Sequence, residues 1–135
     1  MPHSRFSLNA IHAFCAFAAA FLMLPAASAI AAPKRLDCNL TNVETRVGQK
    51  SDSAIESRPI IIAFDKEAKT LSVYQDGSAR ALNNVTISEI SMNGSVDEIS
   101  LGIDPSSLNI VFQTYGINSV RAEFGACSQS LEPLP

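Results

Sequence analysis

Apolar and polar residues alternate through most of the chain after residue 35. Short apolar runs rich in β-branched residues are separated, about every 8 to 12 residues, by polar turn clusters. Inside the runs the apolar residues recur at every second position, as in Ile60, Ile62 and Phe64. Since the side chains of a strand point to alternate faces, this spacing predicts half-buried strands, and no window carries the 3.6-residue apolar stripe of a helix.

The first strand is predicted over 36–47. Its apolar residues change from even to odd positions near Thr41 and Asn42, so a bulge or bend is expected there. The polar stretch 48–58 that follows is interpreted as a loop.

The next two strands are predicted over 59–64 and 69–75. A four-residue loop between them places Ile62 opposite Leu71, so that the apolar residues of both strands share one face. The Asp-Gly pair at 76–77 then predicts another turn.

Four further strands share one apolar face when each pairs with the next through a simple hairpin. They are predicted over 82–92, 99–103, 108–112 and 120–124, joined by turns at 93–95, 104–107 and 115–117. In this register Phe112 lies opposite Val120, and Phe124 points into the core. These four strands form an up-and-down meander.

The expected fold is all-β, a single small antiparallel up-and-down barrel of about seven strands with one disulfide. A sandwich of two β-sheets is the alternative. The domain boundaries are expected to be a signal peptide at 1–29, a flexible segment at 30–35, the β domain at 36–128 and a loose tail at 129–135.

The first 29 residues have the pattern of a secretory signal peptide. A basic polar start and an apolar middle are ended by Pro25, and an A-x-A motif predicts cleavage after Ala29. Cleavage after Ala31 or Ala32 is a second option, and a retained membrane anchor is the alternative, because a span needs roughly 20 apolar residues. Pro25 and the small residues after it favour cleavage. The mature protein is therefore expected to be periplasmic or secreted, without a stable membrane anchor.

Removal of this leader changes the chemistry that remains. The mature part of about 106 residues has no His and no Trp, and nine basic against thirteen acidic residues, a net charge of −4. Without His, the Ser-His and Cys-His forms of nucleophilic catalysis are excluded, as is a metal site of N and S ligands. Mild acidity argues against a nucleic-acid partner. We therefore expect no cofactor, no metal and no enzymatic activity.

Two cysteines, Cys38 and Cys127, remain near the two ends of the mature domain. In an oxidising compartment such a pair predicts one bridge, although two free buried thiols are the alternative. The bridge would close a loop of about 90 residues and stabilise the fold by about 4–5 kcal/mol.

One stretch is a candidate for contact with a partner protein. Asp76, Gly77, Ser78 and Arg80 form a small-residue loop that could insert into a partner's cleft, although an ordinary turn has the same composition.

Three carboxylates, Glu89, Asp97 and Glu98, cluster near the expected Asn-Gly hairpin. They are interpreted as a solvated hairpin end rather than an acid–base pair, because adjacent residues of a strand point to opposite faces.

Several short motifs resemble those of small exported proteobacterial β-domain proteins of unknown function. They are Leu36-Asp37-Cys38, the hairpins at 64–71 and 103–108, and the closing Gly125-Ala126-Cys127. The resemblance spans nearly the whole mature domain, but its motifs are structural, so it implies a fold and no activity.

A second similarity is to periplasmic C-type lysozyme inhibitors, which are small disulfide-bonded β-barrels with a S-G-x-x-Y loop that enters the lysozyme cleft. The nearest stretch here, 77–81, has Gly before Ser and lacks the Tyr, and the family's Trp is absent as well. The inhibitor function is therefore not carried over.

These observations favour a non-catalytic exported domain that binds a protein or a cell-envelope component. The expected partner is a periplasmic or extracellular protein, and the oligomeric state is left open. The alternatives are a small hydrophobic ligand carrier of the lipocalin type and a lysozyme or protease inhibitor.

Overall fold

The computed structural model describes residues 32–135, in which the chain forms strands and turns. The predicted signal peptide at 1–29, with cleavage after Ala29, lies outside the described residues. Nine strands are present in this part of the chain, two more than the sequence predicts. They are β1 (Lys34–Val47), β2 (Lys50–Asp65), β3 (Thr70–Gln75), β4 (Ser78–Ala81), β5 (Asn83–Ile87), β6 (Met92–Val96), β7 (Ile99–Ile103), β8 (Asn109–Gly116) and β9 (Ser119–Ser130).

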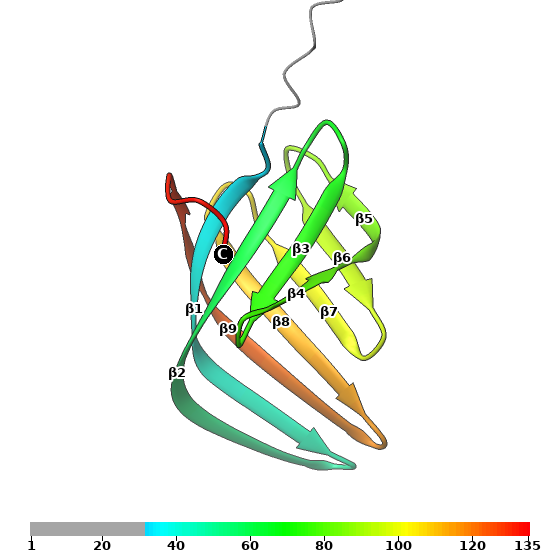
Figure 1. Cartoon of the computed structure of the whole chain (residues 1–135). Coiled ribbons are helices and arrows are strands. Elements are labelled where there is room, and N and C mark those ends of the chain that lie inside the picture. The colour runs from blue at the N-terminus through cyan, green and yellow to red at the C-terminus, as the bar shows by residue number, and fades with distance from the viewer. Residues whose placement is uncertain (1–31) are drawn as a thin grey trace, which may run out of the picture. The chain divides into compact units, whose positions relative to one another are not determined.

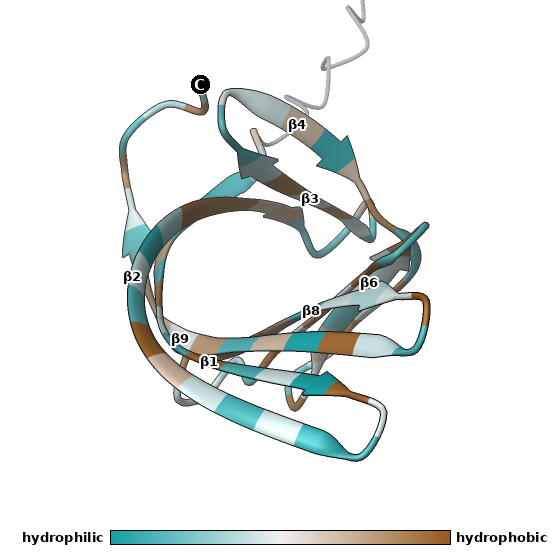
Figure 2. Ribbon diagram, turned by 90° about the horizontal axis from the view of Figure 1, so that it is seen from below, coloured by the Kyte–Doolittle hydropathy of each residue, from teal (hydrophilic) through white to brown (hydrophobic). Residues whose placement is uncertain are grey.

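All nine strands belong to one antiparallel sheet, in the order β4-β3-β2-β1-β9-β8-β7-β6-β5. Each strand pairs with its neighbour in sequence, except that β1 pairs with β9 and that β4 and β5 form the two ends of the sheet (Figure 1). Seen from below, the sheet curls round almost into a ring (Figure 2). The prediction of an antiparallel up-and-down barrel is confirmed in this nearly closed form, and the seven-strand count is wrong.

The core lies inside this curl and is built from alternate side chains. Fourteen buried residues form one continuous cluster: Leu36, Cys38, Leu40, Ile60, Ile62, Leu71, Val73, Leu82, Met92, Ile99, Leu101, Ile103, Ile110 and Phe112. They come from six strands and from Leu82, which links β4 to β5. Burial of these side chains is the main favourable contribution to folding.

The stretch 48–58, predicted to be a loop, instead forms most of the first half of β2. The chain turns at Gly48, whose φ is 58°, and Lys50 pairs with Val47. Residues 50–57 are all exposed, so no apolar face is selected and the alternation that marks the other strands is missing.

The predicted strand 82–92 is two strands, β5 and β6, separated by a bend in which the Ser88 N–H donates to the Ser91 carbonyl at 2.8 Å. The expected turn at Asn93–Ser95 is also wrong, because these residues lie within β6. A Cβ on Gly94 would lie 3.0 Å from Leu82 Cβ, so this glycine makes room for Leu82 beside β6. The turn falls instead between Val96 and Ile99.

Two hairpins have their predicted faces but a different register. Ile62 pairs with Val73 rather than Leu71, because the Asp65 carboxylate accepts hydrogen bonds from two turn N–H groups and Lys69 adopts φ 52°. The four-residue loop therefore lies at 66–69, one residue further along the chain than predicted. In the β7–β8 hairpin, Ile103 likewise pairs with Ile110.

The register between β8 and β9 differs from the prediction by an odd number of residues, which exchanges the two faces of β9. Gly116 pairs with Ser119 through a tighter turn than expected, in which Asn118 adopts φ 59°. As a result Glu123, not Val120, lies opposite Phe112. Phe124 faces outward and is absent from the core cluster.

The bulge predicted near Thr41 is confirmed by a register shift in β1 between Leu40 and Asn42. Across this shift β9 approaches β1 closely at Gly125, where a Cβ would lie only 1.9 Å from the Asn39 carbonyl oxygen. No side chain fits there, so Gly125 is required for the close approach.

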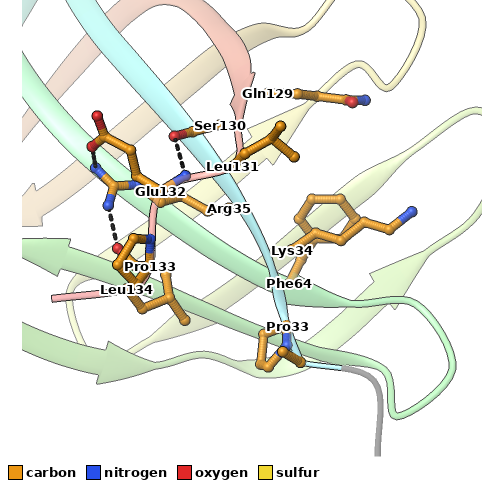
Figure 3. Close-up of a pocket in the computed structure, with 11 residues that line it drawn as sticks. Pro33, Lys34, Arg35, Phe64, Gln129, Ser130, Leu131, Glu132, Pro133 and Leu134 are labelled. Carbon is orange, nitrogen blue, oxygen red and sulfur yellow. Dashed lines mark hydrogen bonds and ion pairs between the residues drawn. The ribbon is translucent and has the colours of Figure 1, made fainter.

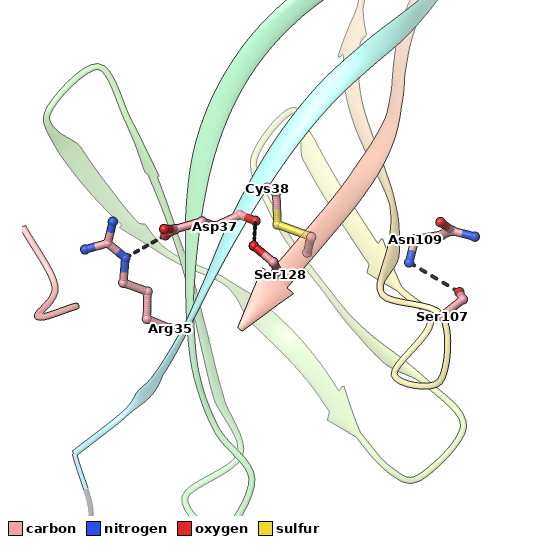
Figure 4. Close-up of a disulfide and its surroundings, with 7 residues drawn as sticks. Arg35, Asp37, Cys38, Ser107, Asn109 and Ser128 are labelled. Atoms are coloured by element: carbon pink, nitrogen blue, oxygen red, sulfur yellow. Dashed lines mark hydrogen bonds and ion pairs between the residues drawn. A yellow bond between two sulfur atoms is a disulfide. The ribbon is translucent and has the colours of Figure 1, made fainter. Parts of the chain in front are cut away.

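A disulfide joins Cys38 of β1 to Cys127 of β9, as the sequence predicts (Figure 4). The two residues are direct cross-strand partners, and the Ser128 hydroxyl beside them donates to the Asp37 carbonyl at 3.5 Å. The bridge is consistent with an oxidising location outside the cytosol.

Replacing Gly125 by Ala is expected to destabilise the domain by at least about 3 kcal/mol, because the added methyl overlaps backbone that the bulge holds in place. Urea unfolding of the purified protein would measure the loss. Gly102→Ala is the matched control, since no atom lies within 4 Å of a Cβ at that strand position, and its effect should stay within about 1 kcal/mol. Equal effects of the two substitutions would contradict the steric argument.

Removing the disulfide through Cys38→Ala and Cys127→Ala together is expected to lower the free energy of unfolding by about 4–5 kcal/mol. The bridge spans 89 residues, and its loss restores the corresponding loop entropy to the unfolded chain. Equilibrium unfolding of the double variant beside the oxidised protein measures this difference. A loss below about 1 kcal/mol would show that the bridge has little thermodynamic role.

Candidate protein-binding surface

The hairpins β1–β2 and β8–β9 project beyond the other strands, at the bottom of Figure 1. β3 pairs with β2 only from Ile61 to Asp65, so the first part of β2 continues without it. We call the projecting part, residues 42–58 and 113–123, the extension. It is a four-stranded piece of sheet in the order β2-β1-β9-β8.

An ion pair on the inner face anchors the extension to the barrel. Arg58 donates to both carboxylate oxygens of Glu123, at 2.9 and 2.5 Å, and its guanidinium lies 5.3 Å from the centre of the Phe112 ring. Glu123 is only 2% exposed. A buried carboxylate is stable only when it is paired and hydrogen-bonded, and the two-pronged contact from Arg58 meets that need.

Two further charges continue this pair into a chain. Arg121 lies 2.7 Å from Glu56 and 3.5 Å from Glu123. The four side chains alternate in sign and come from β2 and β9, which lie on either side of β1. Because every charge in the chain has an opposite neighbour, we interpret the chain as a structural tie between these strands rather than a reactive site.

The tips of the two projecting hairpins lie side by side. The Gly48 N–H donates to the Asn118 carbonyl at 3.1 Å, and Val47 pairs with Ser119. Three large apolar side chains are exposed there: Ile117 at 96%, Val47 at 56% and Tyr115 at 46%. We call these three residues the tip surface.

One exposed cation lies beside the tip surface. Arg46 precedes Val47 and makes no ion pair with any of residues 32–135. Tyr115 is oriented by its hydroxyl, which donates to Gln113 at 2.9 Å. The tip therefore combines apolar contact area, an anchored aromatic ring and a free positive charge, features that are common in protein interfaces.

The residues that the sequence singles out for partner contact lie on a different hairpin. Asp76 and Gly77 form the β3–β4 turn, with φ of 48° and 77°, while Ser78 and Arg80 lie in β4. The Arg80 guanidinium is already engaged, 3.1 Å from Asp97 and 3.2 Å from Glu98. These ion pairs connect β4 to the β6–β7 turn, across the gap at which the barrel is open.

Asp97 and Glu98 lie at an exposed hairpin end, as interpreted from the sequence, but this end is the β6–β7 turn and not the expected hairpin at 93–95. Asp97 and Glu98 are turn residues, not neighbours on a strand, so both reach Arg80. The pKa of Glu98 is lowered by a hydrogen bond from its own backbone N–H and then by Arg80, and the pKa of Arg80 is raised by Glu98. Glu89 is separate from them and pairs with Lys66.

A pocket of about 830 Å³ lies at the opposite end, where the start of β1 meets the C-terminal tail (Figure 3). Phe64, Leu131 and Leu134 are among its lining residues. Arg35 ties the tail down, donating to the Pro133 carbonyl at 2.5 Å and pairing with Glu132 at 3.4 Å. Lys34 and Arg35 thus lie within β1, and the tail has a defined contact, in regions that the sequence suggests are loose.

Sequence reasoning did not find the tip surface. Val47 closes a predicted strand, and Tyr115 and Ile117 belong to a stretch identified only as a turn. The available signal was Ile117 itself, because a large apolar residue in a hairpin turn has no core to enter. The contact between the two tips depends on the β1–β9 register, which the sequence does not reveal.

Arg58→Met is expected to destabilise the domain by about 3 kcal/mol, because it leaves the Glu123 carboxylate buried without its main partner. The double variant Arg58→Met with Glu123→Leu should recover most of that loss, since neither charge then remains. Chemical unfolding of the two variants and the parent protein measures both steps. A double variant less stable than Arg58→Met would contradict this account.

Within residues 32–135, no group of three or more His, Cys, Asp or Glu side chains is placed to hold a metal ion. The same residues include no helix of the length and hydropathy needed to cross a membrane. No protein-family model, curated protein or solved structure matches the chain.

Proposed function

We propose that the mature chain is a non-catalytic exported domain that binds a protein through its tip surface. The observation that carries this proposal is the clustering of exposed apolar side chains. Six large apolar residues are exposed among those described, and three of them lie at two adjacent hairpin tips, with Val47 on the inner face of the sheet and Tyr115 on the outer face. Such a cluster on an otherwise polar surface is typical of a contact site for another protein.

The surroundings of the tip suggest the chemistry of the partner. Arg46 carries a free positive charge on the same face of the sheet as Tyr115, so the partner's surface is expected to combine an apolar centre with an acidic rim. The Cys38–Cys127 bridge supports a partner outside the cytosol, in the periplasm or the medium. An inhibitor of an exported enzyme is a narrower form of this proposal, since a projecting tip has a shape that can enter a cleft.

Carriage of a small hydrophobic ligand has one observation in its favour, the pocket near Phe64 at the end of the barrel remote from the tips. It has less support as the main function. The inward side chains of the strands pack into one continuous cluster, whereas a lipocalin-type carrier holds its ligand within the barrel.

The tip proposal is tested by capture of partners from exported cell fractions. Ile117→Asp is expected to reduce recovery of a specific protein by about 10-fold or more, because it places a charge in the apolar centre of the contact. Ile90→Asp is the matched control, since Ile90 is 86% exposed and lies outside the tip surface. Thermal unfolding of each variant would confirm that both remain folded.

Equal recovery by the parent protein and both variants would contradict a role for the tip. A second outcome would also overturn the proposal. If the domain instead sedimented with anionic phospholipid vesicles, and Ile117→Asp alone prevented this, the tip would contact a membrane surface rather than a protein.

A further inference from the structure

The first half of β2 has an open edge. On one side, residues 50–55 and 58–60 pair with β1, with a register shift between them, but β3 joins the other side only at Ile61. None of the residues that the structure describes pairs with that side of 50–60, which is visible as the outer border of the sheet in Figures 1 and 2. In an antiparallel strand about half of the backbone N–H and C=O groups point to each side, so this edge carries a row of groups available to another strand.

The other two free edges of the sheet are much less suited to pairing. β4 has four residues, and its Arg80 is tied by ion pairs to the β6–β7 turn. β5 has five residues, and its pairing with β6 is interrupted by a register shift. The β2 edge is therefore the longest template among the described strands, and it runs without a register shift from Lys50 to Ile55.

The charged residues along this edge determine which strand can pair with it. The even-numbered residues of β2 point inward, since Arg58 and Glu56 both take part in the ion-pair chain on the inner face. Lys50 lies on the same face by alternation and makes no ion pair with any described residue. Glu56 contacts Arg121 through Oε2, and its Oε1 makes no hydrogen bond with the described residues.

We propose that a second copy of this chain pairs with the open edge, antiparallel, about a two-fold axis at Ser53. In that register Lys50 of each copy lies opposite Glu56 of the other, which gives two symmetric ion pairs on the inner face. The remaining cross-strand pairs are uncharged or carry one charge: Asp52 opposite Ala54, Ser51 opposite Ile55, and Ser53 opposite itself.

The two neighbouring registers that also place the inner faces of both copies on the same side have less favourable charge pairs. With the axis at Ala54, Lys50 would oppose Arg58 and Asp52 would oppose Glu56, so both charged pairs would repel. With the axis at Asp52, two Asp52 carboxylates would face each other and Lys50 would have no opposite charge. Like charges directly opposite each other destabilise a strand pair, so the charge pattern favours the Ser53 register.

The test is the mass of the full exported chain in solution, measured by sedimentation equilibrium over a range of concentrations. The parent protein is expected to form dimers. Lys50→Glu and Glu56→Lys each place like charges opposite each other twice, so each variant alone should dimerise about 10-fold or more weakly. Lys50 is exposed and unpaired in the described chain, so Lys50→Glu is expected to leave the fold intact.

The decisive arm is a mixture of the two single variants. The Lys50→Glu copy then presents a carboxylate at both positions of the pair, and the Glu56→Lys copy presents an ammonium group at both. Each of the two cross-strand contacts in the mixed dimer therefore joins opposite charges again, and the heterodimer should form with an affinity within about 3-fold of the parent. Ile117→Asp, which alters only the tip surface, should leave the dimer unchanged, so this test is independent of the proposed function.

A parent protein that stays monomeric at the highest concentration would overturn the proposal. Dimerisation of Lys50→Glu as strong as that of the parent would overturn it too, because the contact would then involve another surface. A mixture of folded single variants that fails to associate would rule out the Ser53 register.

Discussion

The pairing of β1 with β9 is the contact on which the rest of the structure depends. Without it the sheet would separate into two pieces, β1 to β4 and β5 to β9, each with a half-exposed apolar face. The ladder runs from Arg35 to Val47 and therefore organises both ends of the molecule. At one end it carries the disulfide inside the barrel, and at the other it places the two hairpin tips in contact.

The bulge in this ladder determines what the extension can do. After Leu40 the inward positions of β1 change from even to odd, so Val43, a residue smaller than Leu, follows on the inner face. Arg58 of β2 lies opposite Leu40 and Glu123 of β9 lies opposite Val43, so the ion pair between them crosses β1 at the bulge. Gly125 permits the close approach of β9 to β1 because it has no side chain. The bend and the ion-pair chain beyond it both depend on this approach.

The sequence predicted the parts of this structure that follow from alternation and the parts fixed by covalent chemistry. The strand over 36–47, its bulge and the Cys38–Cys127 bridge are confirmed. Registers were missed where a turn depends on a residue with positive φ, as at Lys69 and Asn118, because such a residue is compatible with more than one turn length. Glu123 was not expected inside because its burial depends on Arg58, which is 65 residues away in the chain.

The candidate surfaces were the hardest to predict, and for one physical reason. The structure identifies these surfaces, Val47, Ile117 and the edge of β2, because no other part of the described chain covers them. A sequence pattern indicates only which residues can be buried. The polar character of 50–57, which concealed a strand, also restricts its pairing. This edge consists mainly of Ser, Asp, Lys and Glu, and Ile55 is its one exposed large apolar residue, so the placement of charge determines which partner strand it accepts.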